Sequence, residues 1–165
     1  MSPWQNGFLR ILYFSSRECW PLNTGARLRD YHLARELARR ASLTYLGLRN
    51  PLDPPSIPPP AEALQSIVIA KDPEYTATKI LRGFVGPVPV NVLNCWTARA
   101  VAELRRLLDS QQFDVVQVEG VHLTPYLPYI RAARSRAAII GDWHNIESEI
   151  MRRYSENTAG LHHRL

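Results

Sequence analysis

The sequence has few of the features that mark secreted, membrane-spanning or metal-binding proteins. Its 165 residues include only two cysteines, Cys19 and Cys95, and no C-x-x-C spacing, so neither a disulfide framework nor a cysteine zinc site is expected. No apolar run approaches the roughly 20 residues that span a bilayer. The N-terminus lacks the basic and apolar regions of a signal peptide. We therefore expect a cytoplasmic protein without a metal site.

Motifs that would assign a function directly are also missing. The chain contains no G-x-G-x-x-G fingerprint, no Walker P-loop, no D-x-D and no G-x-S-x-G. The net charge of +5 fits a nucleic acid, a phosphate-bearing ligand or an anionic membrane surface without choosing among them. Because no basic run with interleaved aromatic residues occurs, the sequence speaks against nucleic-acid binding.

What the sequence does contain is an alternation of short apolar runs and amphipathic stretches. The apolar runs predict strands at 8–15, 43–48, 66–70, 114–118 and 137–141. Helices are predicted at 27–40, 75–84, 95–108, 123–134 and from 145 to 154, with apolar residues on one side at 27–40 and 95–108. Strand, helix and strand in close succession form a βαβ unit. The sequence therefore predicts an α/β fold, a Rossmann-like open and mostly parallel sheet flanked by helices.

Proline is concentrated in one stretch, where it fills six of the ten positions 51–60. Such a stretch is extended and is neither a helix nor a central strand. Too little chain precedes it to form a domain. We therefore interpret 51–60 as a surface loop within a single domain that covers residues 1–165.

The loop after the first predicted strand is the first candidate site, because ligands bind beyond the carboxyl ends of parallel strands. Gly25 would let the backbone approach a ligand closely, and the helix that follows offers free N–H groups to a phosphate. Ala26 lies beside it, and Arg27 and Arg29 could add charge-assisted bonds. An ordinary helix cap, with Asn23 or Thr24 as the capping residue, explains the same residues.

The loops after the fourth and fifth predicted strands carry the other candidates. Glu119 and His122 would bind a hydroxyl-rich ligand or a proton, or simply belong to a polar loop. His144 stands at the end of the fifth strand, where an imidazole can orient or deprotonate a substrate hydroxyl. Asn145 is explained as a helix cap and is also placed to contact the substrate.

Several segments together resemble the N-terminal domain of bacterial glycosyltransferases of family 4. The most distinctive is Asp-Trp-His-Asn-Ile-Glu-Ser at 142–148, which is similar to the family's D-x-H-N-x-E-S segment. The other matching segments are 10–15, 21–29, 31–40 and 113–119. Together they cover most of the chain, and their order and spacing strengthen one another.

This resemblance implies the N-terminal half of a GT-B enzyme, which performs retaining, metal-independent transfer from a nucleotide-sugar donor without a cofactor. By position, Gly25 matches the loop glycine near the donor diphosphate, and His144 matches the histidine that contacts the transferring sugar. Glu119 and His122 would line the cleft. Ala26 departs from the family, which often has a second glycine there.

The resemblance also implies partners. The acceptor is expected to be a sugar or a lipid-linked sugar, with possible peripheral contact to the inner face of the membrane, in cell-surface polysaccharide or glycolipid synthesis. The donor-binding C-terminal domain is not among the 165 residues, so we expect the chain to be inactive alone. A non-catalytic binding module with the same fold is the alternative. A third alternative is an unrelated α/β nucleotide-binding protein. Such a protein is expected to carry an acidic cluster or G-x-G-x-x-G after the first strand, and neither is present.

Overall fold

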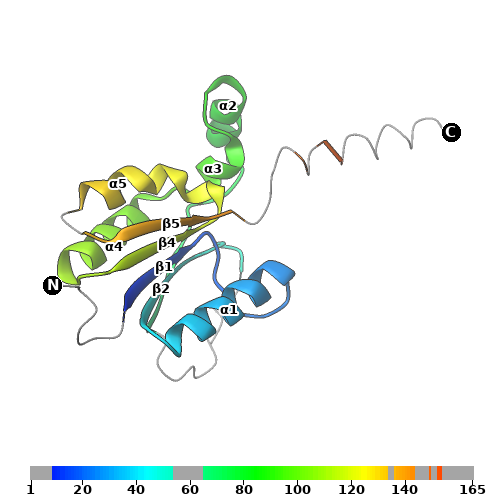
Figure 1. The fold of residues 1–165 in the computed structure, drawn as a ribbon. Helices are drawn as coiled ribbons and strands as arrows, with labels where there is room; N and C mark the ends of the chain where they lie inside the picture. The colour runs from blue at the N-terminus through cyan, green and yellow to red at the C-terminus, as the bar shows by residue number, and fades with distance from the viewer. Residues whose placement is uncertain (1–8, 54–64, 134–135, 144–148, 150–151, 154–165) are drawn as a thin grey trace.

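The computed structural model describes residues 9–53, 65–133, 136–143, 149 and 152–153. Its centre is a five-stranded sheet in the order β3-β2-β1-β4-β5, in which every neighbouring pair is parallel (Figure 1). The strands are β1 (Arg10–Ser15), β2 (Ser42–Arg49), β3 (Gln65–Ala70), β4 (Val115–Glu119) and β5 (Ala138–Asp142). The predicted α/β class and parallel sheet are confirmed.

Helices cover both faces of this sheet. Figure 1 shows α1 on one face and α4 and α5 on the other, while α2 projects away from the sheet. The helices are α1 (Gly25–Ala38), α2 (Ala77–Val85), α3 (Val90–Cys95), α4 (Ala98–Ser110), the 3-10 helix η1 (Val121–Tyr126) and α5 (Leu127–Ala132). In the described part of the chain, no helix is both long enough and apolar enough to cross a bilayer.

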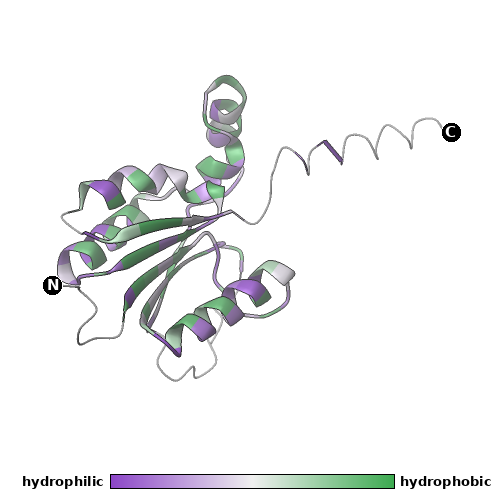
Figure 2. Ribbon diagram, in the orientation of Figure 1, coloured by the Kyte–Doolittle hydropathy of each residue, from purple (hydrophilic) through white to green (hydrophobic). Residues whose placement is uncertain are grey.

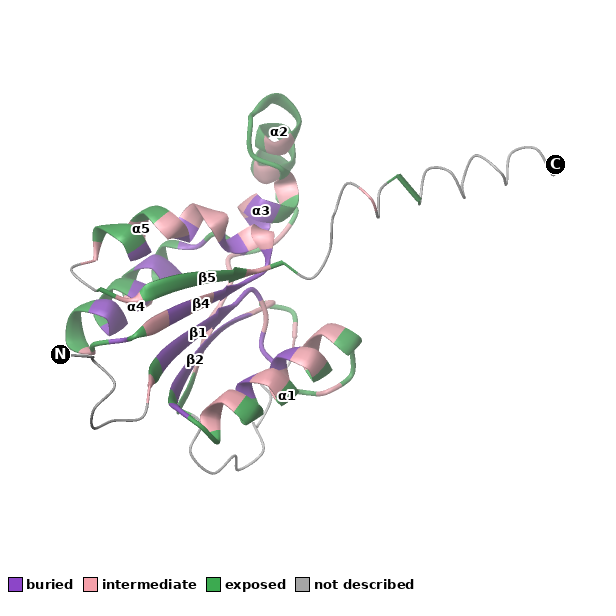
Figure 3. Cartoon of the chain, in the orientation of Figure 1, coloured by how far each residue is buried: buried purple, intermediate pink, exposed green. Residues whose placement is uncertain are grey.

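The core is divided between the two faces, because successive side chains of a strand point to opposite sides. On β1, Ile11 and Tyr13 pack toward α1, whereas Leu12 and Phe14 pack toward α4. The interior strands are therefore buried while β5 is largely exposed (Figure 3). Figure 2 shows the same pattern as apolar central strands and mixed helices. This explains why the strands read as nearly continuous apolar runs.

The predicted helix at 95–108 was wrong in its start, because the chain breaks there into α3 and α4. Trp96 is extended, and Thr97 is the N-cap of α4. The buried hydroxyl of Tyr126 accepts from the Thr97 N–H and donates to the Cys95 carbonyl, both at 2.9 Å. A side chain 29 residues after Thr97 and 31 after Cys95 thus satisfies the backbone groups that an unbroken helix would use.

Two other predictions differ from the structure in detail. The predicted helix at 123–134 starts earlier, as η1, and becomes α5 only at Leu127; the prolines at 125 and 128 favour helix starts over helix interiors. Most of the predicted helix from 145 to 154 and most of the proline-rich stretch lie outside the described residues; of that helix, the structure describes Glu149, Arg152 and Arg153, which are helical.

Candidate functional site

The candidate site is the carboxyl edge of β1, β4 and β5. The chain leaves β1 through α1 toward β2 on one side, and β4 and β5 lie on the other side of β1. In open parallel sheets, the point where the strand order reverses leaves a crevice at the carboxyl ends that binds ligands. Here that point lies between β1 and β4, and charged and polar side chains gather around it.

Arg29 of α1 joins the ends of β4 and β5. Its guanidinium donates to Glu119 Oε2 at 3.0 Å and to Asp142 Oδ2 at 2.6 Å. Glu119 and Asp142 are register partners on adjacent strands, so their side chains leave the same face of the sheet. One arginine thus fixes the position of α1 relative to two strand ends.

The two carboxylates differ in their access to solvent. Glu119 is only 1% exposed, and its second oxygen accepts from the Gln117 amide at 2.5 Å. Asp142 is about one-third exposed, and so is Arg29, at 39%. Burial opposes the charge on Arg29, but Asp142 and Glu119 together raise its pKa above the ordinary value. Arg29 and Asp142 therefore form a partly exposed charged pair, with Glu119 buried behind them.

A third carboxylate, Asp30, lies on the buried side of α1. It is fully buried and accepts from the Ser15 hydroxyl at 2.7 Å. The guanidinium groups of Arg17 and Arg29 lie 4.0 Å from its two oxygens. Burial first, then the charges of Asp30 and Glu119, raise the pKa of Tyr13 far above its usual range, so this neighbouring hydroxyl stays neutral.

The loop after β4 brings His122 to the carboxyl edge, beside Asn91. Gly120 has a φ of 97°, a backbone conformation that residues with a side chain rarely adopt. Its N–H donates to the Asp142 carbonyl at 2.9 Å. His122 Nε2 lies 3.2 Å from the Asn91 amide nitrogen. The backbone at Gly120 lies near both His122 and Ser16. The structure thus brings together His122, Asn91 of α3 and the end of β1.

The predicted first-loop residues lie at the start of α1. Thr24 caps the helix by accepting from the Arg27 N–H at 3.3 Å. Arg27 donates to Asn23 at 3.0 Å and to Asp53, beyond β2, at 2.7 Å. Gly25 is the first residue of the helix, followed by Ala26, and a Cβ added at Gly25 would meet no atom of the described residues within 4 Å.

The fifth-strand candidates are only partly described. Trp143 is exposed, and its ring lies against Gly141, the residue that precedes Asp142. His144 and Asn145 lie outside the described residues. Their predicted roles therefore stay predictions.

Sequence reasoning missed Asp30 and Asn91 as members of this edge. A signal for Asp30 existed, because it lies four residues before Ala34 on the otherwise apolar stripe of α1. A charged residue in such a stripe indicates a buried partner. Asn91 carries no such signal, since its place beside His122 depends on how α3 packs on η1.

Among the described residues, no group of three or more His, Cys, Asp or Glu side chains is arranged to hold a metal ion. Neither a scan against protein-family models nor a search of curated proteins finds a match to this chain. The fold and the side chains of the carboxyl edge therefore carry the functional interpretation.

Proposed function

We propose that this chain is the acceptor-side domain of a retaining, metal-independent glycosyltransferase that uses a nucleotide-sugar donor. Its product would be a cell-surface polysaccharide or a glycolipid. The proposal is supported by the resemblance of 142–148 and the first loop to family 4 enzymes, and by a parallel α/β sheet whose polar residues gather at the carboxyl edge.

The observation that carries the proposal is the open space at Gly25. Glycine lowers helix stability relative to alanine, by about 1 kcal/mol in a helix interior. Among the described residues nothing requires a glycine here, because its backbone is helical and a Cβ would meet none of their atoms within 4 Å. Close approach by a group from outside the chain supplies a reason. The free N–H groups at this helix start favour a diphosphate as that group.

The rest of the edge suits a hydroxyl-rich acceptor. Asp142 accepts hydrogen bonds, Arg29 donates them, and the pair is held in place by buried Glu119. His122 and Asn91 add an imidazole and an amide nearby. In this proposal His144 contacts the transferring sugar, and Asn145 contributes to substrate binding.

A binding measurement on the chain itself tests the phosphate part. UDP, GDP and their sugar conjugates are screened by ligand-observed NMR. We expect at least one of them to show saturable binding. Gly25→Val should weaken that binding about tenfold by blocking backbone approach. Glu36→Val is the matched control, because it places the same side chain on the exposed side of α1. Equal weakening by both variants would contradict a site at Gly25.

A turnover measurement tests the enzymatic part. The chain is combined with a donor-binding C-terminal domain, fused or co-expressed, and supplied with a panel of nucleotide sugars. We expect transfer or donor hydrolysis from one donor, abolished by His144→Ala, and no turnover by the chain alone. Full activity of the chain alone would contradict the acceptor-side assignment.

A second candidate, a non-catalytic binding module, is favoured by one specific observation. Two side chains predicted to contact ligand are engaged within the chain: Arg27 with Asp53, and Glu119 with Arg29 and Gln117. Absence of nucleotide binding, together with no gain of turnover when a donor-binding domain is supplied, would favour this module over the enzyme.

A further inference from the structure

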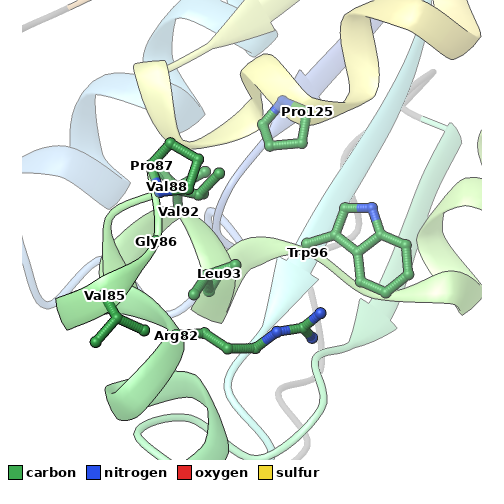
Figure 4. Close-up of a pocket in the computed structure, with 9 residues that line it drawn as sticks. All are labelled: Arg82, Val85, Gly86, Pro87, Val88, Val92, Leu93, Trp96 and Pro125. Carbon is green, nitrogen blue, oxygen red and sulfur yellow. The ribbon is translucent and has the colours of Figure 1, made fainter.

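Apolar side chains gather in the open at two places on the molecule. One is the hairpin formed by α2 and α3, the α2–α3 hairpin, where Phe84 and Val85 are 86% and 79% exposed and a mainly apolar pocket of about 440 Å³ opens (Figure 4). The other is β5, where Ile139 is 38% and Ile140 47% exposed. An apolar pocket by itself leaves the ligand open, whereas a strand also presents main-chain groups in a fixed order. β5 therefore defines its partner more closely.

β5 is an edge strand that is open on both faces. It pairs with β4 and ends the strand order of the described sheet. Because side chains alternate along a strand, Ile140 lies on the α1 side, like Asp142, and Ile139 lies on the opposite side. Figure 3 shows β5 exposed along its length, whereas β3, the other edge strand, packs Ile67 and Ile69 against the core. β5 therefore has the apolar composition of an interior strand in an edge position.

The edge of β5 lacks the features that usually prevent the addition of a strand. Natural edge strands are protected by proline, by a charge or by a bulge. Residues 137–141 are Ala-Ala-Ile-Ile-Gly, without a proline or a charge. Their ladder with β4 runs without a bulge from the pair of Val115 and Ala138 to the pair of Glu119 and Asp142. Such an edge is a template for a further strand.

Two hydrogen bonds show which main-chain groups of β5 point toward β4. The Ala138 N–H donates to the Asp114 carbonyl, and the Gly120 N–H donates to the Asp142 carbonyl, both at 2.9 Å. In a parallel pair, every second residue of a strand directs its N–H and C=O to the same neighbour. Residues 138, 140 and 142 therefore bond to β4. Ile139, between them, directs its N–H and C=O away from β4, toward the open edge.

The sequence around Ile139 is complementary to its own reverse. In an antiparallel pair of two copies centred on Ile139, the two Ile139 residues exchange their N–H and C=O hydrogen bonds, and Ala138 lies opposite Ile140. Arg136 is exposed and lies three residues before this centre, and Asp142 lies three residues after it. The two therefore lie opposite each other, on the same face of the sheet. A pair centred two residues later would instead set Asp142 opposite Ile140 and lose this match.

We propose that two copies of this chain pair through β5 in antiparallel orientation, so that their sheets become continuous and Arg136 of each copy lies beside Asp142 of the other. Asp142 keeps its bond to Arg29, since a carboxylate accepts several hydrogen bonds. The second copy thus adds a cation to the charged pair at the carboxyl edge. The occupant of the edge is a second copy because the edge matches its own reverse in main-chain groups, apolar side chains and charge.

The pairing is independent of sugar transfer, so its test measures association alone. Sedimentation velocity is run on the full chain from about 5 µM to about 500 µM, because a contact smaller than a standard interface gives a weak dimer. We expect a reversible equilibrium of monomer and dimer. Ile139→Lys should lower the association constant at least about tenfold, since it sets like charges opposite each other at the centre of the pair. Leu52→Lys is the matched control, because Leu52 is exposed but lies after β2.

The register of the pair is tested separately. Arg136→Asp should lower the association constant about threefold to tenfold, since it replaces attraction to Asp142 with repulsion. Arg40→Asp makes the same change of charge at an exposed position after α1 and should have less effect. Ile139→Cys should form a disulfide-linked dimer with oxidised glutathione, because a hydrogen-bonded antiparallel pair sets its Cα atoms about 5.5 Å apart. Leu52→Cys should form far less of it. The native cysteines are buried and compete little.

Three results would overturn the proposal. One is a chain that stays monomeric at every concentration. Another is a dimer that Ile139→Lys leaves unchanged and Phe84→Ser abolishes, which would assign the contact to the α2–α3 hairpin. The third is equal weakening by Arg136→Asp and Arg40→Asp, which would show that net charge rather than this register governs association. Thermal unfolding checks that each variant is folded, and Arg136→Asp, at an exposed position, keeps the test decisive if Ile139→Lys does not fold.

Discussion

The carboxyl edge and the α2–α3 hairpin break the usual rule of burial in opposite ways. At the edge, Asp30 and Glu119 are charged residues turned inward. On α2, Phe84 and Val85 are apolar residues turned outward. The buried acids have partners within the chain, in Ser15, Gln117 and Arg29. The exposed apolar side chains of α2 contribute no burial free energy to the folded state.

This difference separates two kinds of function. A buried carboxylate with bonded partners positions other groups, as Glu119 positions Arg29, and its loss should be felt as lost stability. An exposed apolar face contributes little to the folded state and gains free energy only when something covers it. Stability measurements therefore distinguish the two regions, and the following predictions run from the largest expected effect to the smallest.

Two phenylalanines give the sharpest contrast. Phe14 is completely buried and packs edge-on against Tyr126, whereas Phe84 is almost fully exposed. Phe14→Ala should lower the free energy of unfolding by about 3–5 kcal/mol because it leaves a cavity. Phe84→Ala should change it by less than about 0.5 kcal/mol. Urea denaturation measures both, and a cost above about 1.5 kcal/mol at Phe84 would mean that the fold itself covers this face.

Glu119 tests the buried ion network. Glu119→Ala should cost about 2–3 kcal/mol in urea denaturation, below the upper range for buried pairs because Arg29 is partly exposed and keeps Asp142. Glu119→Gln is the control, since it keeps the shape and one acceptor oxygen, and it should cost less. Equal costs for the two variants would show that the carboxylate charge, which both remove, rather than side-chain volume or the remaining acceptor oxygen, holds α1 in place.

The buried Cys19 thiol lies next to the same network, and its ionisation makes the stability of the chain depend on pH. Burial first, then the charge of Asp30, raises the pKa of Cys19 to about 11. Below about pH 9 the thiol is neutral in both states. Between about pH 9 and pH 11 it ionises only in the unfolded chain, so the free energy of unfolding should fall by up to about 2 kcal/mol.

The loss through Cys19 is measured as the difference in pH dependence between wild type and Cys19→Ala, which removes the contributions of the buried tyrosines. The native thiol should also react slowly with a disulfide reagent at pH 8, and rapidly once unfolded. Identical pH slopes for the two proteins would contradict the raised pKa.

Substitution of two glycines at the carboxyl edge should have the smallest effects on stability, and the two effects should have opposite signs. Gly120→Ala should destabilise by about 1–2 kcal/mol, because its φ of 97° strains an alanine although space is available. Gly25→Ala should leave stability unchanged or raise it by up to about 1 kcal/mol. Thermal unfolding measures both. A destabilised Gly25→Ala variant would indicate an internal role for this glycine and weaken the proposed approach of a diphosphate.

Much of the fold was predictable because the signals are local. The apolar runs at 43–48 and 114–118 predicted β2 and β4 to within about two residues, since strands buried on both faces need uninterrupted apolar residues. The break at Trp96 was not predictable, because it depends on the hydroxyl of Tyr126, about 30 residues away. For the candidate site, the positions of the predicted strand ends identified the loops that carry it. The burial of Glu119 and the pairing of Arg27 with Asp53 were not predicted.

The sequence by itself determined the strands, the approximate positions of the helices and the parallel direction of the strands, because hydrophobic periodicity and short connections restrict these locally. It also determined that α2 is amphipathic. Only the tertiary structure decided that the apolar face of α2 points outward, because the close contact between Gly83 and Val90 sets that rotation. Only the tertiary structure joined Arg29 to Glu119 and Asp142, which are 90 and 113 residues away. Such pairings depend on how strands lie side by side, and no local pattern encodes that.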